Sequence, residues 1–109
     1  ADRRVDLILV AGSNVYPAEI EAVLSEHPAV GDVAVFGIPD PEWGEQVTGV
    51  VELVPGGHLE PEELISHAHK IVGSMKAPKE IFIVESLPRS AVGKVLKREI
   101  RASLTEDER

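Results

Sequence analysis

The residue best placed to do chemistry in this sequence is Lys94, which follows Gly93 within the segment from Leu87 to Arg98. Pro88 favours a turn near the start of this segment, and apolar residues recur at helical spacing after Lys94. The pattern predicts a loop with Lys94 near its tip and a helix directly after it. Glycine gives such a loop backbone freedom, and lysine gives it a compact, mobile positive charge. Lys94 could therefore reach out of its own domain toward an anion.

The segment around Lys94 also resembles two more common features, a surface lysine and a P-loop. Most Gly-Lys pairs lie on solvated surfaces, and Lys94 could be an ordinary surface residue before a basic helix. A phosphate-binding P-loop is excluded by its own pattern. That motif requires a glycine where this chain has Pro88, and a serine or threonine where it has Val95.

The composition limits the fold and the compartment. A chain of 109 residues is expected to form one domain, and its apolar residues are mainly aliphatic. It has no cysteine, which excludes disulfides and thiolate metal ligands. We recognise no signal peptide and no apolar run long enough to span a bilayer, so we expect a cytoplasmic protein without a transmembrane segment.

The net charge of −8 argues against nucleic acid as the main partner, and the charge is unevenly distributed. From Val5 to His69 there are twelve acidic residues and no Lys or Arg, whereas from Lys70 to Arg101 there are eight basic and three acidic residues. The basic C-terminal third is either an ordinary solvated pattern or a face that meets an anionic small molecule.

The periodicity of the apolar residues predicts four strands and three helices. In chain order these are a strand at 5–10, a helix at 17–27, strands at 30–38 and 47–54, a helix at 61–73, a strand at 81–84 and a helix after 94. We therefore expect an α+β fold, with a small, mainly antiparallel or mixed three-stranded sheet, helices packed on it, and a short N-terminal strand or hairpin. Within the first long strand, Val33 and Val35 should face one side of the sheet, and Ala34 and Phe36 the other.

No other catalytic or metal-binding constellation is indicated. The serines lie outside any nucleophile-elbow context. His67 and His69 are two positions apart on a predicted helix, so they do not share a face and predict no metal site. The paired acids Glu62 and Glu63 are typical of a helix N-terminus rather than of a general acid and base.

The only tryptophan, Trp43, lies in a predicted loop at 39–45 that is rich in proline and glutamate. Its ring could plug the loop by packing on the sheet. It could also form a platform for a planar group such as a nucleobase, because aromatic rings stack on bases. The residues alone leave both interpretations open.

Six short segments of the chain stand out when they are taken together. They are DRRVD at 2–6, GSNVYPAEIE at 12–21, HPAV at 27–30, PDPEWGE at 39–45, KAPK at 76–79 and LPRSAVGK at 87–94. In this order and spacing they resemble the C-terminal subdomain of AMP-forming acyl-CoA synthetases of the fatty-acid–CoA ligase type. These proteins belong to the superfamily of adenylate-forming enzymes. The resemblance covers the chain from Asp2 to about Arg101.

The resemblance implies a role in a two-step reaction. Members of the family activate a carboxylic acid with ATP to an acyl-adenylate and pyrophosphate, and then transfer the acyl group to coenzyme A and release AMP. A large N-terminal domain holds the acyl site, Mg²⁺ and most of the ATP site. The small C-terminal domain is a mobile lid with one orientation for each half-reaction. Residues 1–104 would be this lid, cut from a longer protein and inactive alone, and residues 105–109 an acidic, frayed tail.

By position, Lys94 matches the adenylation lysine of the family. Attack of the carboxylate on the α-phosphate builds up negative charge, which a mobile ammonium can neutralise together with magnesium on the phosphates. Arg3 matches an arginine that contacts the adenylate ribose. The hinge falls at Val5 and Asp6, where the family usually has Asp or Lys just before the aspartate, and this chain has Val5.

The second half-reaction corresponds to a different set of residues. Gly12 and Ser13 match a loop that lines the pantetheine tunnel, where a missing side chain leaves room for a thin ligand. Trp43, Lys76 and Lys79 match a region that in some members meets the nucleotide end of coenzyme A. The resemblance therefore implies ATP and coenzyme A as ligands, which would explain the basic C-terminal third.

Two alternatives to the acyl-CoA ligase remain. One is the lid of an adenylating enzyme that delivers its acyl group to a carrier protein or to oxygen, and the other is a binding domain without catalysis. The loop at 39–45 favours the coenzyme A branch. The loop that carries an aromatic residue and an arginine in some relatives has Met75 and Ala77 here, which leaves Lys76 and Lys79 as its cations.

Overall fold

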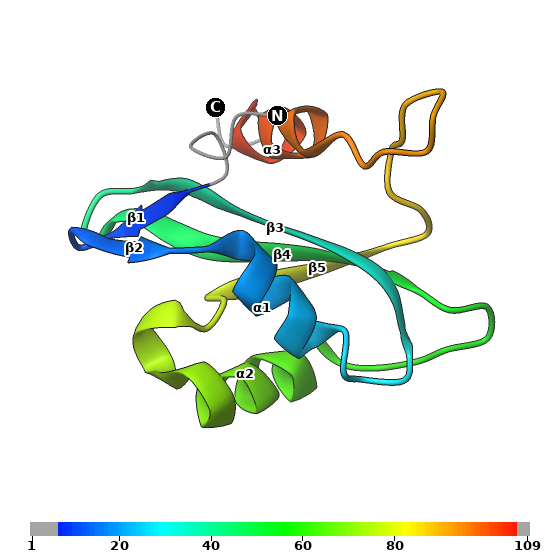
Figure 1. The fold of residues 1–109 in the computed structure, drawn as a ribbon, viewed down its shortest axis with the longest axis horizontal. Coiled ribbons are helices and arrows are strands. Elements are labelled where there is room, and N and C mark those ends of the chain that lie inside the picture. The colour runs from blue at the N-terminus through cyan, green and yellow to red at the C-terminus, as the bar shows by residue number, and fades with distance from the viewer. Residues whose placement is uncertain (1–6, 107–109) are drawn as a thin grey trace.

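Two long strands form the centre of the fold in a computed structural model, which describes residues 7–106 (Figure 1). Strand β3 (Val30–Asp40) and strand β4 (Gly44–Leu53) form an antiparallel hairpin. They pair from Val30 opposite Leu53 to Asp40 opposite Gly44, with one irregularity in register between Val30 and Asp32. Both strands are rich in valine, which suits a pleated surface that is buried on both faces.

Three shorter strands complete a mixed sheet. Strand β5 (Glu80–Val84) runs parallel to β4, on the side away from β3. Strand β1 (Ile8–Val10) is antiparallel to the start of β4 and to β2 (Ser13–Val15). The predicted α+β class is confirmed. The sheet has five strands rather than three, because the N-terminal hairpin joins it as two strands.

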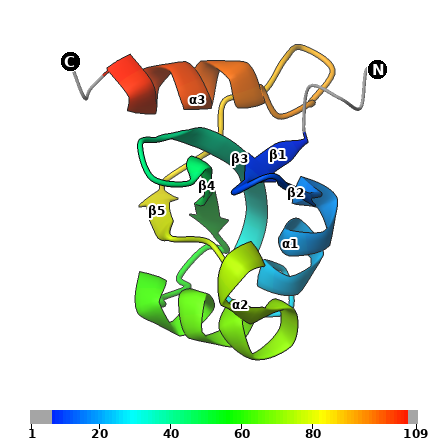
Figure 2. The ribbon, with the colours of Figure 1, turned by 90° about the vertical axis from the view of Figure 1, so that its left-hand side faces the viewer.

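Helices cover both faces of the sheet (Figure 2). Helices α1 (Pro17–Leu24) and α2 (Pro61–Lys76) pack on one face, and α3 (Lys97–Glu106) packs on the other. The alternation predicted for β3 is confirmed. Successive side chains of β3 point to opposite faces of the sheet and enter two separate cores. Val33 and Val35 lie in the core under α1 and α2, whereas Ala34 and Phe36 lie in the core under α3.

Helix α2 begins with a carboxylate cap and contains a kink. The Glu63 carboxylate accepts the backbone N–H of Glu60 at 2.8 Å, and this hydrogen bond lowers the pKa of Glu63. Gly73 is non-helical, with φ of 86°, but the chain resumes a helical turn after it and ends at Lys76. The helix predicted at 61–73 therefore extends three residues further than expected.

The loop predicted at 39–45 is shorter than expected. One carboxylate oxygen of Asp40 accepts the N–H groups of Glu42 and Trp43 at 2.8 and 2.9 Å, which closes a tight turn. The strands therefore pair up to Asp40 and Gly44.

The last helix begins later than predicted and includes part of the expected tail. Val95 bridges to Arg89 in an extended conformation, so α3 starts only at Lys97. Thr105 and Glu106, which the sequence placed in the acidic tail, belong to the helix. Across residues 7–106, no helix has the length and apolar character needed to cross a membrane.

A buried and an exposed residue of α2 together test how this helix packs on the sheet. Leu64 is fully buried, whereas Ile71 on the same helix is 51% exposed. Leu64→Ala should lower the free energy of unfolding by about 2–5 kcal/mol, because it leaves a cavity. Ile71→Ala, the control, should cost less than about 1 kcal/mol. Urea denaturation of the chain measures both values, and equal losses would contradict this packing.

Candidate functional site

Lys94 is exposed in a tight loop that projects from the sheet just before α3 (Figure 1). The loop is closed by backbone bonds, in which Ser90 donates to the Lys94 carbonyl at 2.8 Å and Gly93 donates to the Ser90 carbonyl at 2.9 Å. Gly93 has φ of 87°, a left-handed conformation that glycine adopts without strain. The Lys94 side chain therefore extends from a loop of defined shape.

The base of this loop is tied to the sheet by Arg89. Its guanidinium contacts Asp32 of β3 at 2.7 Å and Glu52 of β4 at 3.1 Å. These hydrogen bonds, first the one to Asp32, raise the pKa of Arg89 further above its already high ordinary value. No local sequence pattern selects Arg89, because both of its partners are distant in the chain.

Gly12 occupies the tip of the β1–β2 hairpin. Val10 pairs with Ser13, and the two residues between them, Ala11 and Gly12, have φ of 50° and 84°. Positive φ at both central positions is typical of a type I′ turn, whose twist matches that of paired strands. Gly12 and Ser13 are exposed, and a Cβ atom on Gly12 would meet nothing within 4 Å.

The Gly12 turn lies beside Trp43. The backbone N–H of Ala11 donates to the Trp43 carbonyl at 2.7 Å. The Trp43 ring packs against the core below α1 and α2, and Lys79 holds its ammonium 4.9 Å from the ring centroid. The indole is therefore partly a plug, as one interpretation predicted, and carries a cation on its face.

Lys76 points elsewhere. Its ammonium lies 3.4 Å from the Glu19 carboxylate of α1, and both side chains are partly exposed. Exposed pairs of this kind contribute little to stability. The structure therefore brings Lys79 to Trp43 and leaves Lys76 in an ion pair between α1 and α2.

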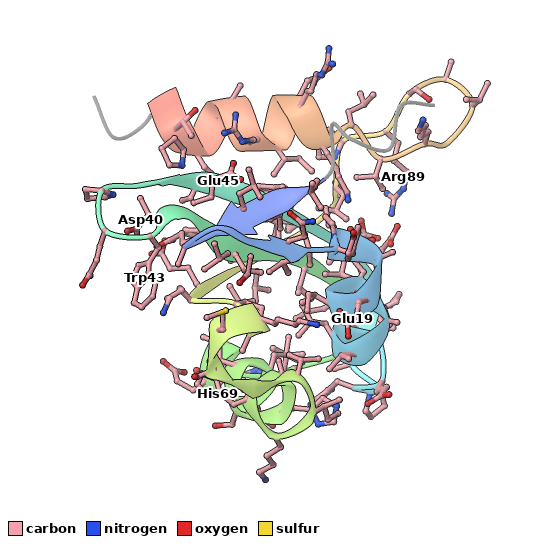
Figure 3. The ribbon with its side chains drawn as sticks, turned by 60° about the vertical axis from the view of Figure 1, so that its left-hand side comes forward. Glu19, Asp40, Trp43, Glu45, His69 and Arg89 are labelled. Atoms are coloured by element: carbon pink, nitrogen blue, oxygen red, sulfur yellow. The ribbon has the colours of Figure 1, made fainter. Side chains whose placement is uncertain are left out.

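The predicted site residues fall into two groups at opposite ends of the central hairpin. Gly12, Trp43 and Lys79 lie near the turn that follows Asp40, whereas the Lys94 loop is anchored at Asp32. At about 3.4 Å per residue, the strand from Asp32 to Asp40 spans about 27 Å. Figure 3 shows Asp40 and Trp43 on one side of the molecule and Arg89 on the opposite side.

Three predicted residues, Arg3, Val5 and Asp6, lie outside the described residues. Within residues 7–106, no group of three or more potential ligands is placed to hold a metal ion. His67 instead contacts the Glu26 carboxylate, at 2.8 Å.

The fold and these loops agree with a family match. Residues 19–94, well over half of the chain, match the family of the AMP-binding enzyme C-terminal domain. The chain belongs to this family, and the resemblance described from its sequence is confirmed.

Similar proteins are several times longer than this chain. The fatty acid–acyl-carrier-protein ligase ScoC of Streptomyces coeruleorubidus is 46% identical over 100 residues, which cover 92% of this chain and 19% of ScoC. A 2-succinylbenzoate–CoA ligase of Bacillus cereus is 42% identical over 105 residues, which cover 96% of this chain and 21% of that protein. The structure of ATP-bound MatB from Rhodopseudomonas palustris matches with a TM-score of 0.90 at 32% identity, over 97% of this chain and 21% of MatB. The chain spans about a fifth of the length of these relatives.

Substitutions at Gly12 test the left-handed backbone conformation of the turn. Gly12→Ala should lower the free energy of unfolding by about 1–2 kcal/mol, because an L-residue is strained in the left-handed region. Gly12→Asn should cost less, since asparagine tolerates this region. No neighbour lies close enough to clash with either side chain at its Cβ. If urea denaturation shows that alanine costs no more than asparagine, the type I′ turn is wrong.

Proposed function

We propose that this chain is the mobile C-terminal lid of a longer AMP-forming ligase, which activates a carboxylic acid, of the fatty acid class, and transfers it to coenzyme A. The observation that carries this proposal is the exposed Lys94 at the end of a loop whose base is fixed to the sheet. Membership of the AMP-binding enzyme C-terminal domain family supports it. The catalytic partner is the large N-terminal domain of the same protein.

In the first orientation, Lys94 serves adenylation. A carboxylate oxygen of the acid attacks the α-phosphorus of ATP, and pyrophosphate leaves. The Lys94 ammonium neutralises the charge that develops between the carboxylate and the phosphate. As the family resemblance implies, Mg²⁺ would lie on the ATP phosphates and be held mainly by the large domain. Arg3 would contact the adenylate ribose, and Val5 and Asp6 would form the hinge.

In the second orientation, the opposite end of the lid serves acyl transfer. The thiol of coenzyme A attacks the acyl carbonyl of the adenylate, and AMP leaves. Gly12 lies in an accessible turn directly before Ser13, and a Cβ on it would meet nothing within 4 Å. The missing side chain would leave space for the narrow pantetheine arm. Trp43 and Lys79 lie beside this turn and would meet the nucleotide end of coenzyme A, with Lys76 close by in the chain.

A carrier protein is the second candidate acceptor, because the similar ScoC is named as an acyl-carrier-protein ligase. The thiol arm is the same in both acceptors, and only coenzyme A adds a nucleotide. The Lys79 ammonium beside the Trp43 ring is a cation suited to the phosphates of a nucleotide, which favours coenzyme A.

Removal of the Lys94 ammonium tests the adenylation role. In the full-length ligase, Lys94→Ala should slow pyrophosphate release by about 10²–10³-fold, or roughly 3–4 kcal/mol. Thioester formation from supplied acyl-adenylate should persist. Lys70→Ala, which removes an exposed lysine of α2, is the matched control.

Adenylation that is unchanged by Lys94→Ala would contradict the proposal. The 109-residue chain alone should release no pyrophosphate, because it spans about a fifth of the length of its relatives and the resemblance assigns the acyl pocket and most of the ATP site to the large domain.

The choice of acceptor can be tested through Lys79. Lys79→Glu should raise the KM for coenzyme A several-fold, because it places a negative charge beside the phosphates of the nucleotide. The KM for pantetheine, which has no nucleotide, should change little. The assignment of coenzyme A as the acceptor is wrong if Lys79→Glu raises the KM for coenzyme A and the KM for pantetheine equally. It is also wrong if only a carrier protein accepts the acyl group.

A further inference from the structure

Arg89 joins the two strands of the central hairpin to the segment that carries Lys94. Asp32 and Glu52 are direct partners across the β3–β4 pair, and the Arg89 guanidinium contacts both. It also donates to the carbonyl of Leu87 at 3.3 Å. One planar guanidinium, with five donors in a fixed fork, can satisfy all three acceptors at once, which an ammonium cannot do in the same geometry.

The connection from Arg89 to Lys94 is short and closed. Arg89 and Val95 bridge each other, and Leu96 donates its backbone N–H to the Pro88 carbonyl at 2.9 Å. These contacts bring the two ends of the loop together beside the guanidinium. Lys94 is the residue directly before Val95, so a displacement of Arg89 is passed on to the backbone of Lys94.

The remainder of the loop has its own internal bonds. In the described part of the chain, the hydrogen bonds found for residues 90–94 join these residues to one another. Val92 at the tip is 89% exposed. The orientation of the loop relative to the sheet is therefore set at its base, where Glu52 also accepts the Leu87 N–H at 2.8 Å.

We propose that Arg89 is a positioning residue for adenylation: by bridging Asp32 and Glu52 it fixes the loop to the sheet, so that Lys94 moves with the lid as one rigid body. This inference rests on the proposed role of Lys94. Without Arg89, two carboxylates would face each other across the strand pair and repel, and the loop would lose its side-chain connection to Asp32 and keep only the Leu87–Glu52 hydrogen bond to the sheet.

Loss of the Arg89 contacts should affect the rate of adenylation much more than the stability of the fold. The Arg89 side chain is 32% exposed and that of Asp32 is 41% exposed, so their ion pair is expected to add little to the stability of the fold. The rate of adenylation is far more sensitive, because a small misplacement of a catalytic group slows a reaction strongly. A selective loss of one half-reaction is therefore expected, without general unfolding.

The experiment compares both half-reactions in the full-length ligase. Arg89→Met should slow pyrophosphate release at saturating substrates by about 10- to 100-fold, because Lys94 is no longer held in place. Thioester formation from supplied acyl-adenylate and coenzyme A should change little. Arg89→Lys should lie between Arg89→Met and the unchanged enzyme, since lysine restores the charge but not the fork. Asp32→Asn should cause a smaller loss, because Glu52 remains as a partner.

Two further variants separate positioning from a general structural effect. Arg101→Met removes another anchoring arginine, whose Nε donates to the Gly37 carbonyl at 2.6 Å, and it should not slow adenylation selectively. In a Lys94→Ala background, Arg89→Met should add almost no further loss, because both residues act through the same ammonium.

The outcomes distinguish this inference from the proposed function. If Lys94→Ala abolishes adenylation but Arg89→Met does not slow it, the role of Arg89 is refuted and that of Lys94 stands. The role of Arg89 is also refuted if Arg89→Met slows both half-reactions equally. Additive losses in the variant that combines Lys94→Ala with Arg89→Met would refute it as well. If Lys94→Ala itself leaves adenylation intact, the proposed function fails first.

Discussion

The antiparallel pairing of β3 with β4 is the constraint on which the other elements depend. Its side chains alternate between two cores, which fixes α1 and α2 on one face and α3 on the other. The outer edge of β3 is closed by side chains from both helical layers. Glu21 of α1 accepts the Val35 N–H at 2.9 Å and pairs with Lys97 at 2.8 Å, while Arg101 of α3 binds the Gly37 carbonyl. An edge covered in this way is protected from pairing with another chain.

The same pairing separates the two candidate loops. Arg89 holds the Lys94 loop at the Asp32 end, and the Ala11–Trp43 hydrogen bond holds the Gly12 turn at the Asp40 end. A span of about 27 Å along β3 is too long for one reacting group to contact both loops. This supports a lid that presents one end and then the other to a single site, with the sheet as its rigid body.

The sequence predicted what depends on local patterns and missed what depends on distant contacts. Alternating apolar residues predicted the long strands and their two faces, and Gly93 with Pro88 predicted the Lys94 loop. A short N-terminal strand or hairpin was predicted, but the second strand of the hairpin, β2, was given no bounds, because its polar residues pair only once Ala11 and Gly12 form their turn. The role inferred for Arg89 could not be predicted either, since no local pattern in the sequence pairs it with acids on β3 and β4.

The central claim is that one rigid lid presents two opposite ends to one site, and a distance measurement tests it directly. The chain has no cysteine, and Val92 is highly exposed, so Val92→Cys provides a unique spin-label position in this domain. Electron paramagnetic resonance would measure its distance to a second label on the large domain. We predict a short distance with ATP and the acid, and a distinctly longer one when the acyl-adenylate and coenzyme A are bound. A single distance distribution that no ligand alters would contradict the claim.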